Sequence, residues 1–472
     1  MSLIRQGGIH KAPTTTAFGE LAVSQETPIV QISSEYGLLG VLTATLGGSD
    51  AIVDNMFTAS TGTGANNVSA IISQREANQR PGQGLACKIS ALFSTGQPNS
   101  LQQAGLISSE SAFAFGYDGA EFGILYGSGG QLETQSLQVT VGGGNESATI
   151  TVDGVAHSVP ITNSSIVENA YEIAQELNIL EERYRFSSNG DSVTALARLP
   201  DFGAGLFAFS SATAIAAWTE IKAGLIPAEV WTPIESWNQV PNFNIDPTKL
   251  NDYKIQIQGN VNFYIKEKDT GEFTLVHIMK YINTATKPSI GNPTFRVGWA
   301  ARNSGNTTNL VVQGNYASAF VEGMVKYNQN PTGKSNVQSS VGGVATNVLS
   351  LRNRSVFKDS ANRAEIIPIL LSIGTDSTKP VLFEVIALPQ TVEFLEWQYV
   401  DEANSLMEYS ISDVPITGQS VAVFTVTGSL PPIDMQKILE FASPTSEFSI
   451  TARTTAGAAS EMIASATWKD DL

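Results

Sequence analysis

Alternating apolar and polar positions recur along most of this chain, and the clearest pair of such runs lies at residues 113–126. In FAFGYDGAEFGILY the apolar residues of each run share one face, and Asp118-Gly119 between the runs supplies the positive φ values of a tight turn. This pattern predicts a β-hairpin with aromatic cross-strand pairs. Residues 85–93 alternate in the same way and predict a third strand with one buried face.

Gly142-Gly143-Gly144 break this pattern, a unit of different pattern follows, and the sandwich pattern resumes from Trp231. From Trp231 onward, strand-like runs alternate about Gly259-Asn260 and follow a Thr270-Gly271 turn. Because the later runs complete the earlier pattern, we predict one discontinuous β-sandwich from residues 61–135 and 227–325. Residues 136–226 are then an insertion.

The insertion has a different pattern. Two hairpin signals, at Asp153-Gly154 and at Asn189-Gly190, flank a helical stretch that opens with Ser165 and Glu168 as a capping box. Apolar residues then fall on one helical face, namely Ile166, Ala170, Ile173, Ala174, Leu177 and Leu180. The predicted order is strand, strand, helix, strand, strand, an inserted ββαββ domain.

The flanking segments are less regular. Residues 1–60 are polar and rich in Gly and Thr, which indicates either an N-terminal arm that orders on a neighbour or a plain peripheral segment. Residues 326–343 read as a linker, since they resist both helix and sheet. Strand-like runs divided by Pro, Asp and Gly then predict a second β-sandwich over residues 344–472.

Composition agrees with a mainly β protein of several domains. The 472 residues include 41 Gly and 20 Pro, and only 15% are charged. The formal charge is −17 and no basic cluster occurs, so we expect no nucleic-acid partner. The N-terminus lacks a signal-peptide pattern and no run is long enough for a membrane span, so synthesis in a cytoplasm without membrane insertion is expected. The single cysteine, Cys87, lies on an apolar strand face and cannot form an internal disulfide.

Catalytic patterns are sparse. Residues 267–272 match E-x-D-x-x-E, which some β-sandwich glycoside hydrolases use, but the match overlaps a turn, which favours solvated carboxylates over a catalytic pair. The three histidines, His10, His157 and His277, are far apart in sequence. The Gly-rich runs lack a following helix and a lysine. We therefore expect no catalytic residue, no metal and no cofactor.

An aromatic and carboxylate patch that contacts a glycan is the one binding site that the sequence suggests, although buried sandwich aromatics are the commoner explanation. Its residues are Tyr117, Asp118, Tyr126, Trp231 and Trp237.

Several segments resemble virion structural proteins of large double-stranded DNA viruses of algae and protists and of some tailed phages. The segments are QRPGQGLACKISALF and FAFGYDGAEFGIL within residues 79–126, IDPTKLNDYKIQI, DTGEFTLVHI, NPTFRVGWAARNSGNTTNL, TNVLSLRNRSVF and the closing Ala466-Thr467-Trp468. The resemblance covers about residues 60–472 and implies a concanavalin or laminin-G-like jelly-roll sandwich. The insertion is similar to a module of phage tail proteins, including contractile-sheath and baseplate components. These motifs carry no catalytic residues.

The sequence and this resemblance together predict a non-enzymatic virion protein, acting as a capsid-associated, fibre, spike or tail component. Its expected partners are itself, as a homo-oligomer, other virion proteins, and host surface glycans. Two alternatives stay open: a glycan-binding or glycan-cleaving β-sandwich protein, and an adhesin exported by a non-classical route.

Overall fold

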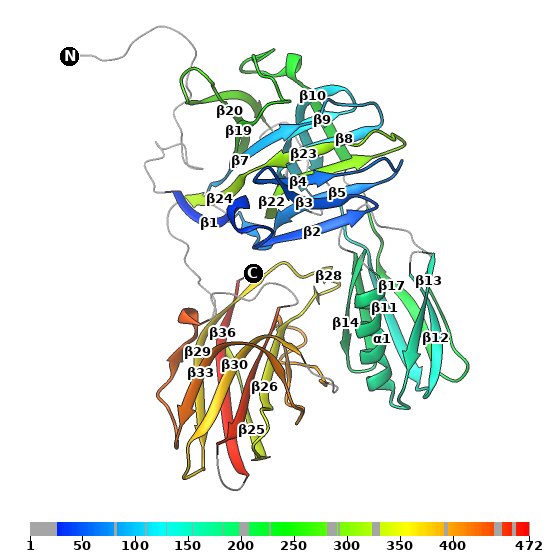
Figure 1. Cartoon of the computed structure of the whole chain (residues 1–472), viewed down its shortest axis with the longest axis vertical. Helices are drawn as coiled ribbons and strands as arrows, with labels where there is room; N and C mark the ends of the chain where they lie inside the picture. The colour runs from blue at the N-terminus through cyan, green and yellow to red at the C-terminus, as the bar shows by residue number, and fades with distance from the viewer. Residues whose placement is uncertain are drawn as a thin grey trace, which may run out of the picture. The chain divides into compact units, whose positions relative to one another are not determined.

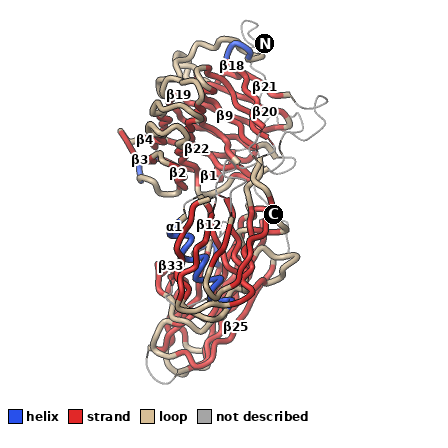
Figure 2. Tube along the Cα trace, turned by 90° about the vertical axis from the view of Figure 1, so that its right-hand side faces the viewer, coloured by secondary structure: helices blue, strands red, loops and turns tan. Residues whose placement is uncertain are grey.

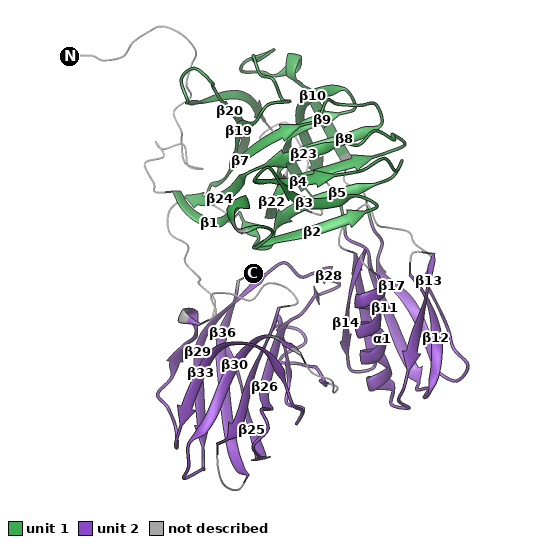
Figure 3. Cartoon of the chain, in the orientation of Figure 1, with its two compact units in different colours: residues 1–131, 225–325 green, residues 132–224, 326–472 purple. Residues whose placement is uncertain are grey.

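The computed structural model of the chain describes residues 26–79, 83–108, 111–128, 130–152, 154–181, 183–197, 207–225, 228–280, 290, 293–322, 331–390, 395–438, 446–455 and 459–471. Two compact units divide the chain (Figure 3). Unit 1 comprises residues 1–131 and 225–325, and unit 2 comprises residues 132–224 and 326–472. Strands dominate both units, as Figure 2 shows in red, and α1 (Ile166–Leu180) is the one α-helix among the described residues.

Unit 1 is a sandwich of two antiparallel sheets (Figure 1). The first sheet contains, among the described residues, β1 (Glu26–Ser33), β3 (Ser49–Val53), β4 (Met56–Ser60), β7 (Leu85–Phe93), β19 (Asn251–Gln258), β20 (Asn260–Lys266), β21 (Phe273–Met279), β23 (Val311–Gly314) and β24 (Tyr316–Glu322). The second sheet contains β2 (Val41–Leu46), β5 (Val68–Ser73), β6 (Ala77–Asn78), β8 (Ser100–Ile107), β9 (Ser111–Asp118), β10 (Glu121–Ser128), β18 (Ala228–Pro233) and β22 (Thr294–Asn303). Short 3₁₀ turns η1 (Ser34–Tyr36) and η2 (Ile234–Ser236) complete the unit.

Strands from both sides of the insertion alternate within these sheets. β10 pairs with β18, β7 pairs with β19, and β8 pairs with β22. Where the chain leaves unit 1 and returns, Gln131 and Leu225 exchange two backbone hydrogen bonds of 2.8 and 2.9 Å. Unit 1 is therefore one sandwich built from two separate stretches of sequence.

The core of unit 1 lies between its sheets and is rich in aromatic rings. Phe115 from β9 lies 4.7 Å from Tyr253 and 5.5 Å from Phe263, both on the opposite sheet, measured between ring centroids. The hairpin predicted at residues 113–126 is present as β9 and β10. Its turn is shifted by one residue, since Asp118 pairs with Glu121 and Gly119, with a φ of 59°, takes the first central position.

The insertion forms an α+β module within unit 2. Its strands belong to two small sheets, one of β11 (Thr134–Val141), β14 (Tyr184–Asn189), β15 (Ser192–Ala197) and β17 (Ile215–Lys222), and one of β12 (Glu146–Val152), β13 (Val155–Ile161) and β16 (Ala208–Ser210). The predicted helix begins where expected, because the Ser165 side chain accepts a hydrogen bond from the backbone N–H of Glu168. Its buried face includes Ala170, Ile173 and Leu177, while Leu180 is exposed.

The rest of unit 2 is a second antiparallel sandwich, as predicted. One sheet contains β25 (Thr332–Val341), β29 (Glu365–Thr375), β34 (Ile433–Asp434) and β36 (Ser460–Asp471), and the other contains β26 (Thr346–Asn353), β30 (Val381–Gln390), β31 (Gln398–Tyr399), β32 (Met407–Ser410), β33 (Thr417–Val426) and β35 (Glu447–Thr454). A hairpin of β27 (Val356–Phe357) and β28 (Ser360–Ala361) and the turn η3 (Met435–Lys437) lie outside this pair. Residues such as Ile366 and Trp468 meet Val385 and Ile450 in its core.

Two boundary predictions need correction. The predicted arm of residues 1–60 contains β1 to β4 from residue 26 onward, and Phe57 there is fully buried against Trp299. The predicted linker of residues 326–343 contains β25, which pairs along β36. β1, β2, β3 and β25 are edge strands of their sheets, and their polar residues lower the hydrophobicity by which a strand is recognised in a sequence.

Candidate functional site

The aromatic residues proposed for a glycan patch do not share one surface. Tyr117, Tyr126 and Trp237 pack in or against the core between the sheets of unit 1, and burial raises the pKa of Tyr117. Trp231 packs on the other face of the same sheet, against Leu101, Ala114 and Leu125. Asp118 is exposed at the end of β9. The five residues therefore do not form a single binding platform.

The E-x-D-x-x-E segment forms the predicted hairpin tip between β20 and β21. Gly271 has a φ of 68°, and the backbone N–H of Glu267 donates to the carbonyl of Glu272. The Glu267 carboxylate accepts hydrogen bonds from the hydroxyls of Thr270 and Thr274, while Asp269 and Glu272 are exposed. Glu267 thus stabilises the turn, and the other two carboxylates face solvent.

The residues most often used for metal binding or nucleophilic attack are also engaged elsewhere or buried. His157 Nε2 lies 3.2 Å from Glu181 Oε2, and His277 Nδ1 accepts from the backbone N–H of Asn238. Burial lowers the pKa of His277 and raises that of the Cys87 thiol. His10 lies outside the described residues. Within the described ranges, no group of three His, Cys, Asp or Glu residues is placed to hold a metal ion, and no helix is long and apolar enough to span a membrane.

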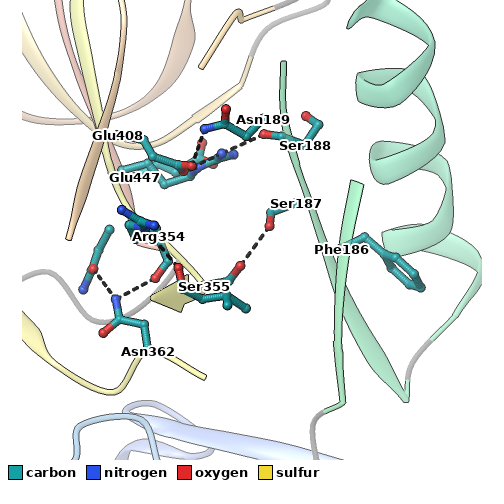
Figure 4. Close-up of polar contacts among 12 residues, drawn as sticks. Phe186, Ser187, Ser188, Asn189, Arg354, Ser355, Asn362, Glu408 and Glu447 are labelled. Carbon is teal, nitrogen blue, oxygen red and sulfur yellow. Dashed lines mark hydrogen bonds and ion pairs between the residues drawn. The ribbon is translucent and has the colours of Figure 1, made fainter. Parts of the chain in front are cut away.

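A cluster of charged and polar side chains does converge in unit 2, where the inserted module meets the C-terminal sandwich (Figure 4). We call it the polar junction: Ser187, Ser188 and Asn189 from β14, and Arg352, Arg354, Ser355, Glu408 and Glu447 from the sandwich. The alternation of β14 builds the module's side of it. Phe186 points toward the module core, whereas Ser187 points toward the sandwich.

Arg352 is the centre of the polar junction. Its guanidinium is buried and lies 2.7 Å from Glu408 Oε2 through both Nε and Nη2, and 3.6 Å from Glu447 Oε1 through Nη1. Nη2 also donates to the carbonyl of Ser188, at 2.9 Å. The ring of Trp397 lies 4.3 Å below the guanidinium carbon. One side chain therefore joins three strands of the sandwich to the module.

Two further hydrogen bonds cross the polar junction close to Arg352. Asn189 Nδ2 donates to Glu408 Oε1 at 2.6 Å, and the hydroxyls of Ser187 and Ser355 lie 2.9 Å apart. A third hydrogen bond, outside the polar junction, joins the same two parts: Lys222 Nζ from β17 donates to the Ser360 hydroxyl at 2.8 Å. Every one of these contacts joins the module to the C-terminal sandwich.

The segment after β26 is held rigidly beneath these contacts. Arg354 donates to the carbonyls of Val356, Glu402 and Ser405, and its guanidinium carbon lies 4.3 Å from the ring of Tyr399. Asn362 Nδ2 donates to the carbonyl of Arg354 at 2.7 Å. Ser355 is therefore presented to Ser187 by backbone that is fixed on both sides.

The electrostatics of the polar junction favour the charged form of Arg352. Burial by itself lowers the pKa of Arg352, but the carboxylates of Glu408 and Glu447 outweigh it, so the pKa is raised. Burial raises the pKa of Glu447, and the Arg352 charge offsets only part of that increase. Tyr171 of α1 is close enough for the Glu447 charge to contribute to its raised pKa, after burial. The carboxylates here neutralise a buried cation.

Sequence reasoning did not find the polar junction. TNVLSLRNRSVF contains both arginines, but Glu408 and Ser188, the partners of Arg352, lie 56 and 164 positions away in the chain. The available signal was two arginines two residues apart, at the end of an apolar strand, in a chain with few basic residues. That spacing places both on one strand face.

No family model matches the chain, and no curated protein matches it. Similar solved structures include arcelin-5, a lectin-like defense protein from Phaseolus vulgaris (8% identity; 60% of this chain and 93% of arcelin-5 covered; TM-score 0.23), and lectin I from Ulex europaeus (7%; 60% and 98%; 0.21). A third is the binding domain of botulinum neurotoxin serotype D/C (7%; 80% and 68%; 0.27). At these TM-scores the likenesses carry no argument about this chain. Its own sheets define the class: a mainly β protein of two sandwiches with an inserted α+β module.

Proposed function

We propose that this protein is a non-enzymatic structural component of a virus or phage particle, which assembles with itself and with other virion proteins and contacts a host surface. The polar junction is the observation that carries the proposal. Its buried charges are used to hold one module against another, which is what a scaffold that transmits or bears load requires. The resemblance of the sequence to virion proteins supplies the setting, with synthesis in the host cytoplasm.

Purified particles provide the direct test. We expect mass spectrometry to find the chain in gradient-purified particles at a stable ratio to the major coat protein, and to find the recombinant protein in a defined homo-oligomer. A chain that occurs in infected cells but is absent from particles contradicts the proposal.

Glycan binding is a second candidate, favoured by the outer face of the first sheet of unit 1. There Tyr264, Lys254 and Lys88 stand directly opposite one another on neighbouring strands. Lys254 Nζ lies 5.7 Å from the Tyr264 ring centroid, and Lys88 Nζ lies 4.7 Å from that of Phe320. Aromatic rings beside ammonium and amide groups offer both stacking and hydrogen bonding to a sugar.

A glycan array separates this face from the residues first suggested. Tyr264→Ala is expected to abolish any array signal, while Trp231→Ala, on the other sheet, is expected to leave it unchanged. A polysaccharide-degradation assay with Glu267→Gln and Glu272→Gln tests the enzymatic alternative. Cleavage that disappears in both variants would replace the structural proposal with a glycoside hydrolase.

A further inference from the structure

We propose that β33 is the contact through which two copies of this chain pair, edge to edge, about a two-fold axis at Val423. This inference rests on the proposed function and names the surface through which the chain would self-assemble. β33 is the last strand of its sheet and, in the part of the chain that the structure describes, pairs only with β30. Such an edge exposes backbone groups that can extend the sheet with another strand.

The other long edges are protected in ways that β33 is not. The loop at residues 238–240 covers β21, donating from the N–H groups of Gln239 and Val240 to the carbonyl of Val276. β18 contains Glu229 and Pro233, and β25 contains Lys334. Among the described edge strands, β33 is the longest that has neither a charged residue nor a proline.

Apolar side chains on β33 are incompletely buried at this edge of the sandwich. Ala422 and Phe424 point to the core but are only partly buried, whereas Val426, farther along the strand, is fully buried. On the outer face Val421 and Val423 are 37% and 54% exposed. A further strand with apolar residues on both faces would cover all four side chains.

The charge pattern argues that the added strand comes from a second copy. The chain has a net charge of −17, so two copies repel each other over most surfaces, but residues 414–433 contain no charged residue. An antiparallel pair related by a two-fold axis perpendicular to the sheet keeps the core faces of both copies on the same side. The strand itself therefore brings no charge to the contact.

One register fits these side chains best. With the axis at Val423, each Ala422 stands opposite Phe424 of the other copy, so a small residue meets a large one twice. Val423 then stands opposite its own copy, and Val421 stands opposite Thr425. Residues 422–426 of β33 pair with Val381–Val385 of β30 without a bulge, and the register shifts only at Val421, so the centre of this contact extends a regular part of the sheet.

Cysteine cross-linking tests this register in the full-length chain. The native Cys87 is fully buried, so an introduced cysteine is the only accessible thiol. Val423→Cys is expected to give a disulfide-linked dimer under mild oxidation. Val421→Cys is expected to give none, because the two copies of residue 421 are about 14 Å apart along the strands. Equal cross-linking at both positions, or none at 423, overturns the proposal.

Charge substitution tests the same axis without oxidation. Val423→Lys places two ammonium groups opposite each other and is expected to weaken self-association at least about tenfold in sedimentation. Val337→Lys, at a similarly exposed valine on the edge strand β25, is the matched control and should sediment like the wild type. Mixing Val423→Lys with Val423→Glu should restore pairing.

A Val423→Lys chain that self-associates like the wild type excludes this contact. If such a chain still enters particles, the structural role stands and only the β33 surface is wrong. Absence of the wild-type chain from particles is the separate result that contradicts the structural role.

Discussion

Individual carboxylates in this protein stabilise local structure through hydrogen bonds to residues that are distant in the sequence. Glu146, on β12, accepts hydrogen bonds from the hydroxyls of Ser211 and Thr213, both at 2.7 Å, and from the backbone N–H groups of residues 212, 213 and 214. The Ser211 and Thr213 hydroxyls lower the pKa of Glu146 to about 2, with help from the backbone. A partly exposed glutamate therefore fixes the turn that leads into β17.

Glu146→Gln should loosen this turn, because the amide turns a donor toward groups that are themselves donors. The folded-state pKa is depressed, so the wild-type contribution is complete above about pH 4.5 and is lost as pH falls toward 2. We expect faster amide hydrogen exchange at residues 212–214 in the variant at pH 6, with the difference from wild type shrinking below pH 4. Unchanged exchange at pH 6 would contradict this role.

The pKa of Asp50 in unit 1 is shifted in the opposite direction from that of Glu146. Its Oδ1 accepts from the Ser69 hydroxyl, Oδ2 is buried without a hydrogen bond from any described residue, and burial raises the pKa of Asp50 to about 6. Because the folded-state pKa exceeds the ordinary value, stability from protonation is complete below about pH 4 and is lost as pH rises through 6.

Asp50→Asn is therefore expected to stabilise unit 1 at pH 7.5 by about 1–2 kcal/mol, a figure reduced from the full shift because the group is partly solvated. Near pH 4 the two proteins should unfold alike. Urea unfolding at both pH values makes the comparison, and a variant that is less stable at every pH would show that the hydrogen bond to Ser69 matters more than the charge.

At the scale of elements, the polar junction depends on a buried arginine, and a second ion pair in the same sandwich provides its control. Arg352→Met leaves Glu408 buried without its cation, at a cost of about 3–5 kcal/mol in the unfolding free energy of unit 2. Arg453→Met removes a partly exposed pair with Glu384, at 3.6 Å, and should cost less than about 1 kcal/mol. Denaturant unfolding of both variants makes the comparison. Equal losses of unfolding free energy in the two variants would contradict the central role of Arg352.

The same scale shows what the sequence could predict. Period-two patterns, the Gly119 turn and the Ser165 cap identified the hairpin, the helix and both sandwiches, because those signals are local. Edge strands such as β25 were missed, since their outward residues are polar and only their pairing with β36 defines them. The polar junction was missed for the same reason: Arg352 meets Ser188 across 164 positions, and no local period encodes such a contact.

The whole molecule is organised by the point where the chain leaves unit 1 and returns. Gln131 and Leu225 are hydrogen-bonded to each other, so a short Gly-Ser connection can replace residues 132–224 without straining unit 1. We expect the shortened protein to keep the calorimetric transition of unit 1. The transition of the C-terminal sandwich should move to lower temperature, because Arg352 and Glu408 lose Ser188 and Asn189. Loss of both transitions would show that unit 1 needs the module to fold.

The burial of the single thiol in this chain determines how the protein responds to a change of redox environment. Cys87 is enclosed in the core of unit 1, and its raised pKa keeps it from ionising. Neither reductants nor oxidants therefore have a thiol to act on at the surface, and no disulfide has to form or break for the sandwiches to hold. Passage from the reducing interior of a cell to an oxidising exterior leaves the cysteine chemistry of this protein unchanged.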